Sequence, residues 1–186
     1  MLLKKHWIPE YVWHRVTQIV YQWSSRNSPW LTESAVQILD RWLRPTDRAM
    51  GWGSGRSTVW LAERVGHLLA LEHNPEWLGL VAEKLRSHRL LIVDLRLALD
   101  TSPTIKDESL DFAIVDGVER DACALNAIRH LKLGGISWVD DAHRYLPSQC
   151  RSPFARRMDS EPATAEWARF AEELRGWRCG WTPKPC

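Results

Sequence analysis

Apolar residues fall at helical spacing in two stretches at the start of the chain. Residues 9–24 carry valine, isoleucine and tryptophan on one face. A second helix is predicted from an N-cap at Thr32 to a stop at Pro45. Because both helices precede the rest of the pattern, we expect residues 1–45 to form a helical cover whose apolar faces pack onto the sheet described next.

From residue 46 onward, short apolar runs alternate with amphipathic stretches. The apolar runs predict strands at residues 48–52, 67–72, 90–95, 110–115 and 136–139. The stretches between them predict helices at residues 57–65, 75–85 and 124–131. Gly66 is predicted to be the C-cap of the first of these helices, and Gly134 and Gly135 to close the last. Strands separated by helices of this length are typical of βαβ units. The pattern therefore predicts an α/β fold, with a doubly wound, mostly parallel sheet and helices on both faces.

The pattern weakens towards the C-terminus. Residues 145–160 are predicted to be an irregular loop, a helix follows around Trp167–Leu174, and residues 177–182 are a weak candidate for a last strand. We expect a single domain over residues 1–186, with its core at 46–146, and a C-terminal segment at 147–186 that leaves the sheet edge shortened.

Composition agrees with a soluble globular protein, with 45% hydrophobic and 26% charged residues. A net charge of +2 gives no argument for a nucleic-acid partner. No apolar run approaches the ~18 residues of a membrane span, and the N-terminal stretch does not resemble a secretory signal. The four cysteines show no CxxC pair, so we expect free thiols and a cytoplasmic protein. The oligomeric state is not predicted.

A glycine-rich stretch, AMGWGSGRSTVWL, occupies residues 49–61 between a predicted strand and a predicted helix. Glycine lets a backbone approach another molecule closely, and the turn before a helix presents unpaired N–H groups. Glu72 stands nineteen residues after Gly53, at the end of the next predicted strand. An acid there is suited to bind the ribose hydroxyls of a nucleotide.

Acidic residues also follow the later strands. Asp116 follows the fourth, and Asp140 and Asp141 follow the fifth, with His143 just beyond. In open α/β sheets, ligands bind beyond the carboxyl ends of the strands, so these side chains are candidates for one site. The third glycine of a dinucleotide fingerprint is missing here, which makes the match to a nicotinamide site poor.

Four segments within residues 30–146 resemble the class I, Rossmann-like S-adenosylmethionine-dependent methyltransferases: GWGSGRSTVWLAERVG, ALEHNPEW, LDFAIVDG and LKLGGISWVDDAHRY. The resemblance implies that Glu72 binds the ribose of S-adenosylmethionine and that Asp116 faces the sulfonium and the substrate. The cofactor-binding positions that it implies are Gly51, Gly53, Ser54, Gly55, Ser57, Thr58, Glu72, His73, Asp116 and Gly117. Two of them depart from the family pattern, because Gly51 replaces an acid and Ser57 replaces a third glycine.

Candidate catalytic residues are His143 and Asp116. His143 is a possible general base, because the unperturbed pKa of histidine is about 6.5. Asp116, Asp140 and Asp141 stand where catechol O-methyltransferase and its relatives bind Mg²⁺, and three carboxylates suit such an ion. The metal site is a hypothesis; in the alternative, Asp140 or Asp141 caps the following segment.

These observations predict a methyltransferase that uses S-adenosylmethionine to methylate a small molecule. Two alternatives stay open. One is a binding or regulatory protein that has kept the fold and lost catalysis, and the other, ranked last, is a nicotinamide-dependent oxidoreductase. Arg151, Arg156 and Arg157 leave a nucleic-acid acceptor open as well.

Overall fold

The computed structural model of the protein describes residues 9–24, 28–87, 92–98, 103–150, 152 and 154–182. The chain divides into two compact units. Leu39–Asp140 form one, here called the strand unit, and Met1–Ile38 with Asp141–Cys186 form the other, here called the terminal unit. The single domain predicted over residues 1–186 stays a prediction, because two compact units can belong to one domain.

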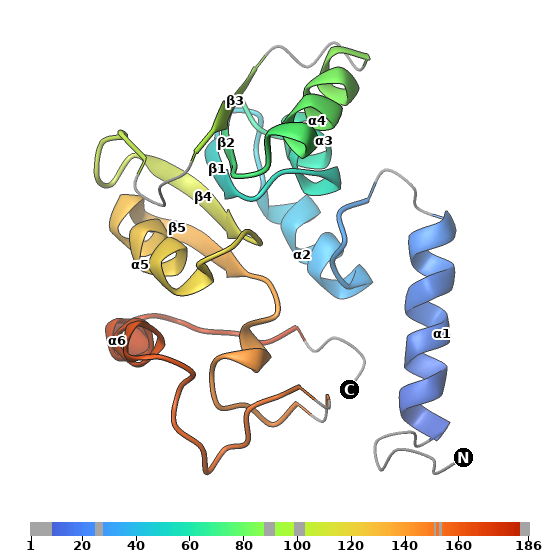
Figure 1. The fold of residues 1–186 in the computed structure, drawn as a ribbon, viewed down its shortest axis with the longest axis vertical. Coiled ribbons are helices and arrows are strands. Elements are labelled where there is room, and N and C mark those ends of the chain that lie inside the picture. Colours follow the sequence, from blue (N-terminus) through green and yellow to red (C-terminus); the bar gives the residue numbers. More distant parts are fainter. Residues whose placement is uncertain are drawn as a thin grey trace. The chain divides into compact units, whose positions relative to one another are not determined.

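The strand unit is built on a five-stranded parallel sheet (Figure 1). Its strands are β1 (Arg48–Trp52), β2 (His67–Glu72), β3 (Val93–Leu97), β4 (Leu110–Val115) and β5 (Leu131–Val139). Their order in the sheet is β3-β2-β1-β4-β5. The predicted α/β fold with a parallel sheet is therefore confirmed.

Helices cover both faces of this sheet. Figure 1 shows α3 (Arg56–Ala62) and α4 (Pro75–Ser87) on one side and α5 (Arg120–His130) on the other. The chain winds outwards from β1 to β3 and then restarts next to β1 with β4. Because parallel crossovers have a fixed hand, this reversal moves the connecting helix to the opposite face. The sheet is doubly wound, as predicted.

Each face of the sheet has its own buried apolar layer. On the face towards α5, a buried cluster joins the strand side chains to Cys123 and Ala127; its strand members are Met50, Trp52, Leu69, Leu71, Leu110, Ala113, Val115 and Leu131. Strand side chains alternate between faces, so Phe112, which is fully buried, belongs to the other layer. The ring of Trp42, at the end of α2 (Glu33–Trp42), packs against Phe112 at a centroid distance of 6.3 Å.

Helix α3 ends earlier than predicted. It was expected to run to residue 65 with Gly66 as its C-cap, but it ends at Ala62 and Glu63 is the C-cap residue. Gly66 instead lies in the turn before β2, where its N–H donates to the carbonyl oxygen of Asp47 at 3.0 Å. A Cβ at Gly66 would lie only 2.4 Å from the carbonyl oxygen of Pro45, so this turn requires glycine.

Strand β5 begins earlier than predicted. The predicted helix over 124–131 stops at His130, and β5 starts directly at Leu131. The pairing of β4 with β5 shifts register between Leu110 and Phe112, and regular pairing resumes at Ile136. The bulged residues in between include the two glycines that the sequence assigned to a helix end. Strand β3 is also displaced, to Val93–Leu97 from the predicted 90–95, of which residues 90 and 91 lie outside the described residues.

The terminal unit contains α1 (Pro9–Ser24), most of α2, η1 (Ala142–Arg144), α6 (Ala165–Glu173) and η2 (Leu174–Gly176). Thr32 caps α2 as predicted, because its hydroxyl oxygen accepts a hydrogen bond from the N–H of Ala35 at 3.3 Å. The strand predicted at residues 177–182 is wrong. This segment is mostly exposed and has no strand partner in the described part of the chain. Within the described residues the sheet ends at β5, so the predicted shortened edge is confirmed.

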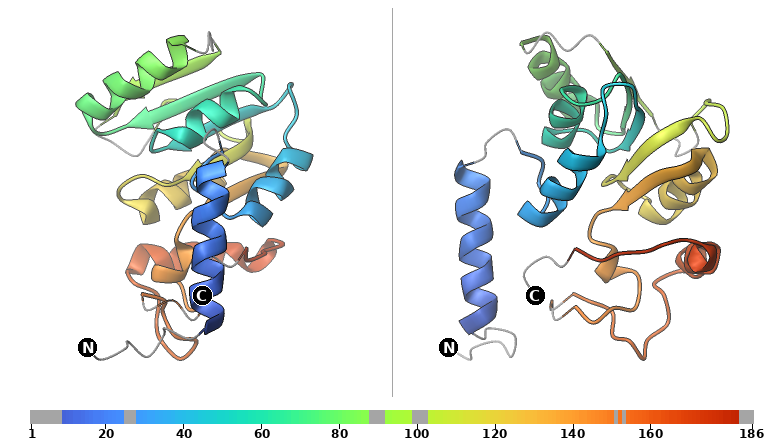
Figure 2. Two further views of the ribbon diagram at one scale, coloured as in Figure 1. Left: turned by 90° about the vertical axis from the view of Figure 1, so that its right-hand side faces the viewer. Right: turned by 180° about the vertical axis from the view of Figure 1, so that it is seen from behind.

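Helix α1 forms where predicted but does not bury its apolar face. It is a single unbroken helix (Figure 2). Its valine, isoleucine and tryptophan side chains are 40–79% exposed, whereas Gln22 is buried. The side-chain amides of Gln18 and Gln22 donate to the carbonyl oxygen of Leu31, each at 2.9 Å. Helix α1 belongs to the terminal unit and the sheet to the strand unit, so the expectation that this apolar face packs onto the sheet stays a prediction.

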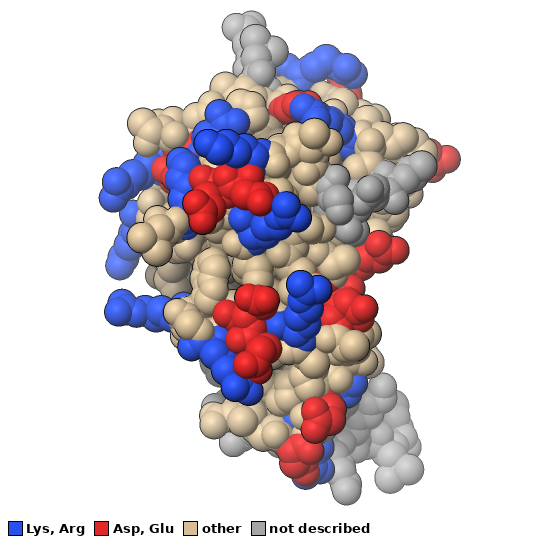
Figure 3. All heavy atoms as spheres, turned by 90° about the vertical axis from the view of Figure 1, so that its left-hand side faces the viewer, with Lys and Arg blue, Asp and Glu red and all other residues tan. Residues whose placement is uncertain are grey.

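The surface carries mixed charge. Figure 3 shows lysine and arginine side chains interspersed with acidic ones on one face of the molecule. Ion pairs such as Arg129 with Asp107 at 2.9 Å account for part of this mixture. Cys123 and Cys179 are free thiols as predicted, but Cys150 is disulfide-bonded, so that prediction is wrong for Cys150. Among the described residues, no helix has the length and apolar character needed to cross a membrane.

The turn at Gly66 gives a stability prediction with an internal control. Gly66→Ala should lower the free energy of unfolding by roughly 1–3 kcal/mol, because its Cβ would force the backbone at Pro45 to move. Gly79→Ala, inside α4 with nothing within 4 Å of its Cβ, should raise it by about 0.5–1 kcal/mol. Urea unfolding of both variants measures the difference. Equal effects of the two substitutions would contradict the assignment of Gly66 to a crowded turn.

Candidate functional site

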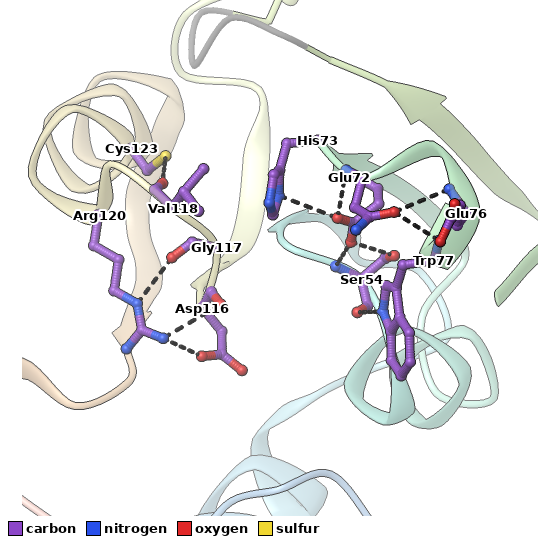
Figure 4. A network of polar contacts seen from close by, with 11 residues as sticks. Ser54, Glu72, His73, Glu76, Trp77, Asp116, Gly117, Val118, Arg120 and Cys123 are labelled. Carbon is purple, nitrogen blue, oxygen red and sulfur yellow. Dashed lines mark hydrogen bonds and ion pairs between the residues drawn. The ribbon is translucent and has the colours of Figure 1, made fainter. Parts of the chain in front are cut away.

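The candidate site lies at the carboxyl ends of β1, β2 and β4. Strands β1 and β4 are neighbours although they are not consecutive in the chain, so the direction of winding reverses between them. In doubly wound sheets, ligands bind at this reversal point, beyond the carboxyl ends. Ten of the residues predicted from the sequence lie within these strands or in the segments that follow them, and Figure 4 shows their central contacts.

Two glycines allow the segments after β1 and β4 to touch. Gly53 has a φ of +91°, and a Cβ there would lie 2.9 Å from the backbone nitrogen of Gly117. A Cβ at Gly117 would lie 3.1 Å from the backbone nitrogen of Gly53. The N–H of Asp116 donates to the carbonyl oxygen of Trp52 at 2.9 Å, which extends the strand pairing to this point. Any side chain at either glycine would separate the two segments.

Glu72 joins the glycine loop to the segment after β2. Its side chain is only 4% exposed. Oε2 accepts hydrogen bonds from the N–H of Ser54 at 3.0 Å and from its hydroxyl at 2.8 Å. Oε1 accepts from the N–H of Asn74 at 3.0 Å and lies 3.1 Å from Nδ1 of His73. Each carboxylate oxygen therefore has one backbone partner and one side-chain partner.

These contacts determine the protonation of Glu72. Burial alone raises the pKa of the carboxyl group, but hydrogen bonds from the Asn74 N–H and from the hydroxyl and N–H of Ser54, together with nearby His73, outweigh burial. The net result is a pKa below the ordinary glutamate value. Glu72 is therefore a carboxylate at neutral pH, and it attracts hydrogen-bond donors.

Trp77 holds the glycine loop from the other side. Asn74 caps α4, because its side-chain oxygen accepts from the N–H groups of Glu76 and Trp77 at 2.9 and 3.0 Å. This cap places Trp77 in the first turn of α4, from where its indole N–H donates to the carbonyl oxygen of Ser54 at 2.8 Å. Both peptide groups flanking Ser54 are thus fixed, and the loop is preorganised.

Arg120 makes the corresponding connection between β4 and β5. Its Nη2 lies 2.7 Å from Oδ1 of Asp116, and its Nε and Nη1 donate to the carbonyl oxygens of Gly117 and Asp140 at 3.0 and 2.7 Å. The guanidinium group therefore fixes the segments that follow two neighbouring strands. Asp116, predicted to face a ligand, is the partner of a positive charge within the protein (Figure 4).

The remaining predicted residues are divided between the strand unit and the terminal unit. Gly51 is buried within β1, and the Thr58 hydroxyl oxygen accepts from the N–H of Gly55 at 3.0 Å in the first turn of α3. Ser57 is half-buried on the same helix. Asp141 and His143 belong to the terminal unit, so they stay predicted site residues.

The three predicted metal ligands do not form a recognised cluster. Asp140 is buried and Asp116 pairs with Arg120. Across the ranges that the structure describes, no three histidine, cysteine, aspartate or glutamate side chains are grouped so that they could hold a metal ion.

Sequence reasoning missed Trp77 and Arg120 as parts of the site. Arg120 follows Asp116 by four residues, a spacing that brings side chains together on a helix, but here α5 begins only at Arg120. Trp77 is the third residue after the Asn74 cap, and its contact with Ser54 depends on the separation of two loops that the sequence does not give.

Comparison with solved structures places the fold in a known class. The YcgJ protein of Bacillus subtilis is 13% identical with a TM-score of 0.54, over 76% of this chain and 68% of that one. Precorrin 8w decarboxylase of Methanobacterium thermoautotrophicum is 28% identical with a TM-score of 0.51, over 60% and 63%. A proposed S-adenosyl-L-methionine-dependent methyltransferase of Methanococcus maripaludis is 15% identical with a TM-score of 0.51, over 75% and 65%.

The fold is shared with the proposed methyltransferase of Methanococcus maripaludis, so the predicted resemblance to the class I S-adenosylmethionine-dependent methyltransferases is confirmed at the level of the fold. The chain spans less than two thirds of the length of two of these three structures. No protein-family model matches the sequence, and no curated protein matches it either.

The Glu72 network predicts how stability depends on pH. A group whose pKa is lowered by folding stabilises the protein above its unfolded-state pKa and loses that effect as the pH falls through its folded-state pKa. Glu72→Gln leaves buried donors poorly matched, which costs about 1–3 kcal/mol at neutral pH. The difference from the wild type should shrink as the pH falls below about 4.5.

Urea unfolding at several pH values between 7 and 3.5 measures this difference. Glu83→Gln, which removes an exposed carboxylate on α4, is the matched control and should change stability little. A difference between Glu72→Gln and the wild type that stays constant with pH would contradict the proposed role of the charge.

Proposed function

We propose that the protein is an S-adenosylmethionine-dependent methyltransferase that acts on a small-molecule acceptor. The shared fold supports this general kind of reaction, and the site lies at the reversal point of the sheet. The observation that carries the proposal is the Glu72 carboxylate, buried at the end of β2 beside a preorganised glycine loop. A carboxylate in this position is suited to accept hydrogen bonds from the two hydroxyls of a ribose.

The partners of Glu72 suggest how a ribose would fit. Each oxygen accepts one backbone N–H, from Ser54 or Asn74, and these bonds hold the two loops. Each oxygen also contacts one side chain, the Ser54 hydroxyl or the His73 imidazole. We propose that these two side-chain groups occupy the positions of the ribose hydroxyls and turn away when the nucleoside binds. The carboxylate would then have four contacts both without and with the cofactor. Its surroundings therefore fit a ribose that donates two hydrogen bonds.

S-adenosylmethionine carries an activated methyl group on a sulfonium, so the enzyme mainly has to position the acceptor. The glycines at 53 and 55 would admit the methionine part, and Asp116 with Gly117 would border the acceptor. Arg120 holds the Asp116 carboxylate in one orientation. His143 is proposed as a base for acceptors that must lose a proton.

Magnesium is not part of the proposal. A divalent cation at Asp116 would lie beside the guanidinium of Arg120, which already neutralises that carboxylate at 2.7 Å. The Asp116 carboxylate therefore does not fit a divalent cation in this arrangement.

A small acceptor is favoured over nucleic acid because two arginines in the C-terminal segment, Arg144 and Arg157, are paired with acids; Arg151 lies outside the described residues. Arg157 contacts Asp159 at 3.1 Å, and Arg144 contacts Asp141 at 3.2 Å. Nucleic-acid binding depends on a cluster of unneutralised positive charge.

A binding protein that has lost catalysis is the second candidate, and Gly51 is the observation in its favour. The buried glycine provides no carboxylate for the amino group of the cofactor. A charge-assisted hydrogen bond of that kind contributes about 1.5–3 kcal/mol, so its absence weakens binding without abolishing it. Methyl transfer from labelled cofactor to a panel of small-molecule acceptors distinguishes an enzyme from a binding protein.

Calorimetric titration with S-adenosylhomocysteine tests the proposed ribose contact. Glu72→Gln should weaken binding ten- to a hundredfold, the equivalent of about 1.5–3 kcal/mol for hydrogen bonds to a charged group. Ser54→Ala should lower the stability of the free protein by about 1 kcal/mol, because it removes one hydrogen bond to Glu72. The same substitution should leave affinity unchanged or increase it, because the hydroxyl competes with the ligand.

Both titrations are repeated with NAD⁺ as the comparison ligand. Heat on addition of NAD⁺, with none for S-adenosylhomocysteine, would favour the oxidoreductase alternative. Equal losses of affinity in Ser54→Ala and Glu72→Gln would contradict the replacement of side-chain donors by ribose hydroxyls.

A further inference from the structure

Helix α1 leaves its apolar side chains exposed and uses polar ones to contact its own unit. Gln22 is buried and donates to the carbonyl oxygens of Pro29 and Leu31 at 3.2 and 2.9 Å. Gln18 donates to Leu31 at 2.9 Å, and the Tyr21 hydroxyl lies 3.4 Å from that of Ser28. These contacts lie within the terminal unit and fix which face of α1 packs against residues 28–31.

The outward face carries a continuous apolar stripe. Val12, Val16, Ile19 and Trp23 follow one another at intervals of four, three and four residues, the spacing of the core positions of a coiled coil. Trp13 and Val20 flank this row. All six side chains are at least 40% exposed. We call these six residues the α1 stripe.

The α1 stripe is large enough to form an interface. Aromatic side chains bury 150–250 Å² each, so its two tryptophans, 68% and 79% exposed, leave about 300 Å² uncovered. With the four aliphatic side chains the stripe reaches on the order of 600 Å², the upper limit for a typical monomer surface. Two such stripes together bury about 1,200 Å², the lower limit of a standard specific interface.

We propose that the α1 stripe is covered by α1 of a second copy of the chain, packed antiparallel about a two-fold axis. The surface is self-complementary in that orientation, because Trp23 of each copy faces Val12 of the other and Val16 faces Ile19. A parallel pair would place Trp23 against Trp23 and Val12 against Val12. Alternation of large and small side chains across an interface favours the antiparallel arrangement.

The composition of α1 argues against a lipid surface as the occupant. Helices that lie in a membrane interface carry many lysines and arginines on the polar face. Helix α1 contains a single arginine and no lysine. Its buried polar face is instead formed by glutamine that is bonded to the protein.

Sedimentation equilibrium of the full chain tests the dimer. The wild type should show a concentration-dependent monomer–dimer equilibrium, and Val16→Glu should raise the dissociation constant at least tenfold. Leu80→Glu introduces the same charge at an exposed leucine of α4 and should leave it unchanged. Helical circular dichroism checks that both variants are folded.

A wild-type monomer at every concentration, or equal effects of the two substitutions, overturns the proposal. Binding of the monomer to vesicles of phosphatidylcholine and phosphatidylserine, abolished by Val16→Glu, would assign the stripe to lipid and also overturn it.

Disulfide crosslinking tests the orientation, in chains where Cys179 is replaced by serine. A mixture of Val12→Cys and Trp23→Cys chains should form the mixed dimer, because the two positions face each other in an antiparallel pair. Val12→Cys alone should not crosslink. Crosslinking of Val12→Cys to itself, or failure of the mixture to crosslink, overturns the antiparallel arrangement.

Discussion

The hydrogen bonds of one buried carboxylate shape the candidate site. Glu72 accepts backbone N–H groups from the loop after β1 and from the segment after β2, so both segments are fixed relative to the end of the same strand. The cost of burying this charge is offset by its four contacts, which keep the group ionised. A site of this kind needs little rearrangement to receive a ligand, because only side-chain donors have to move.

The same principle operates on the other side of the reversal point. Arg120 binds the Asp116 carboxylate and two backbone carbonyls, and so joins the ends of β4 and β5. Between these two networks, Gly53 and Gly117 bring the segments after β1 and β4 into direct contact. The positive charge of Arg120 beside Asp116 also disfavours Mg²⁺ there, although the carboxylates are spaced along the sequence in a way that resembles catechol O-methyltransferase.

The sequence predicts most of the strand unit, because parallel strands and their helices carry strong periodic patterns. The prediction failed where tertiary contacts override local signals. Gly66 looked like a helix cap but is required by the nearby backbone of Pro45, and the glycines at 134 and 135 lie in a bulge that only strand pairing specifies. For α1, the apolar period correctly predicted the helix, but a pattern identifies an apolar face without identifying what covers it. Arg120 and Trp77 were missed because their contacts depend on loop geometry.

The central claim is that Glu72 holds the amides of Ser54 and Asn74 before any ligand is present. Hydrogen exchange of these two backbone amides, followed by NMR in the free protein and with S-adenosylhomocysteine, tests it most directly. Both amides should exchange slowly in the free protein, although they lie in loops, and should remain protected when the ligand binds. Rapid exchange of both amides in the free protein would contradict the account.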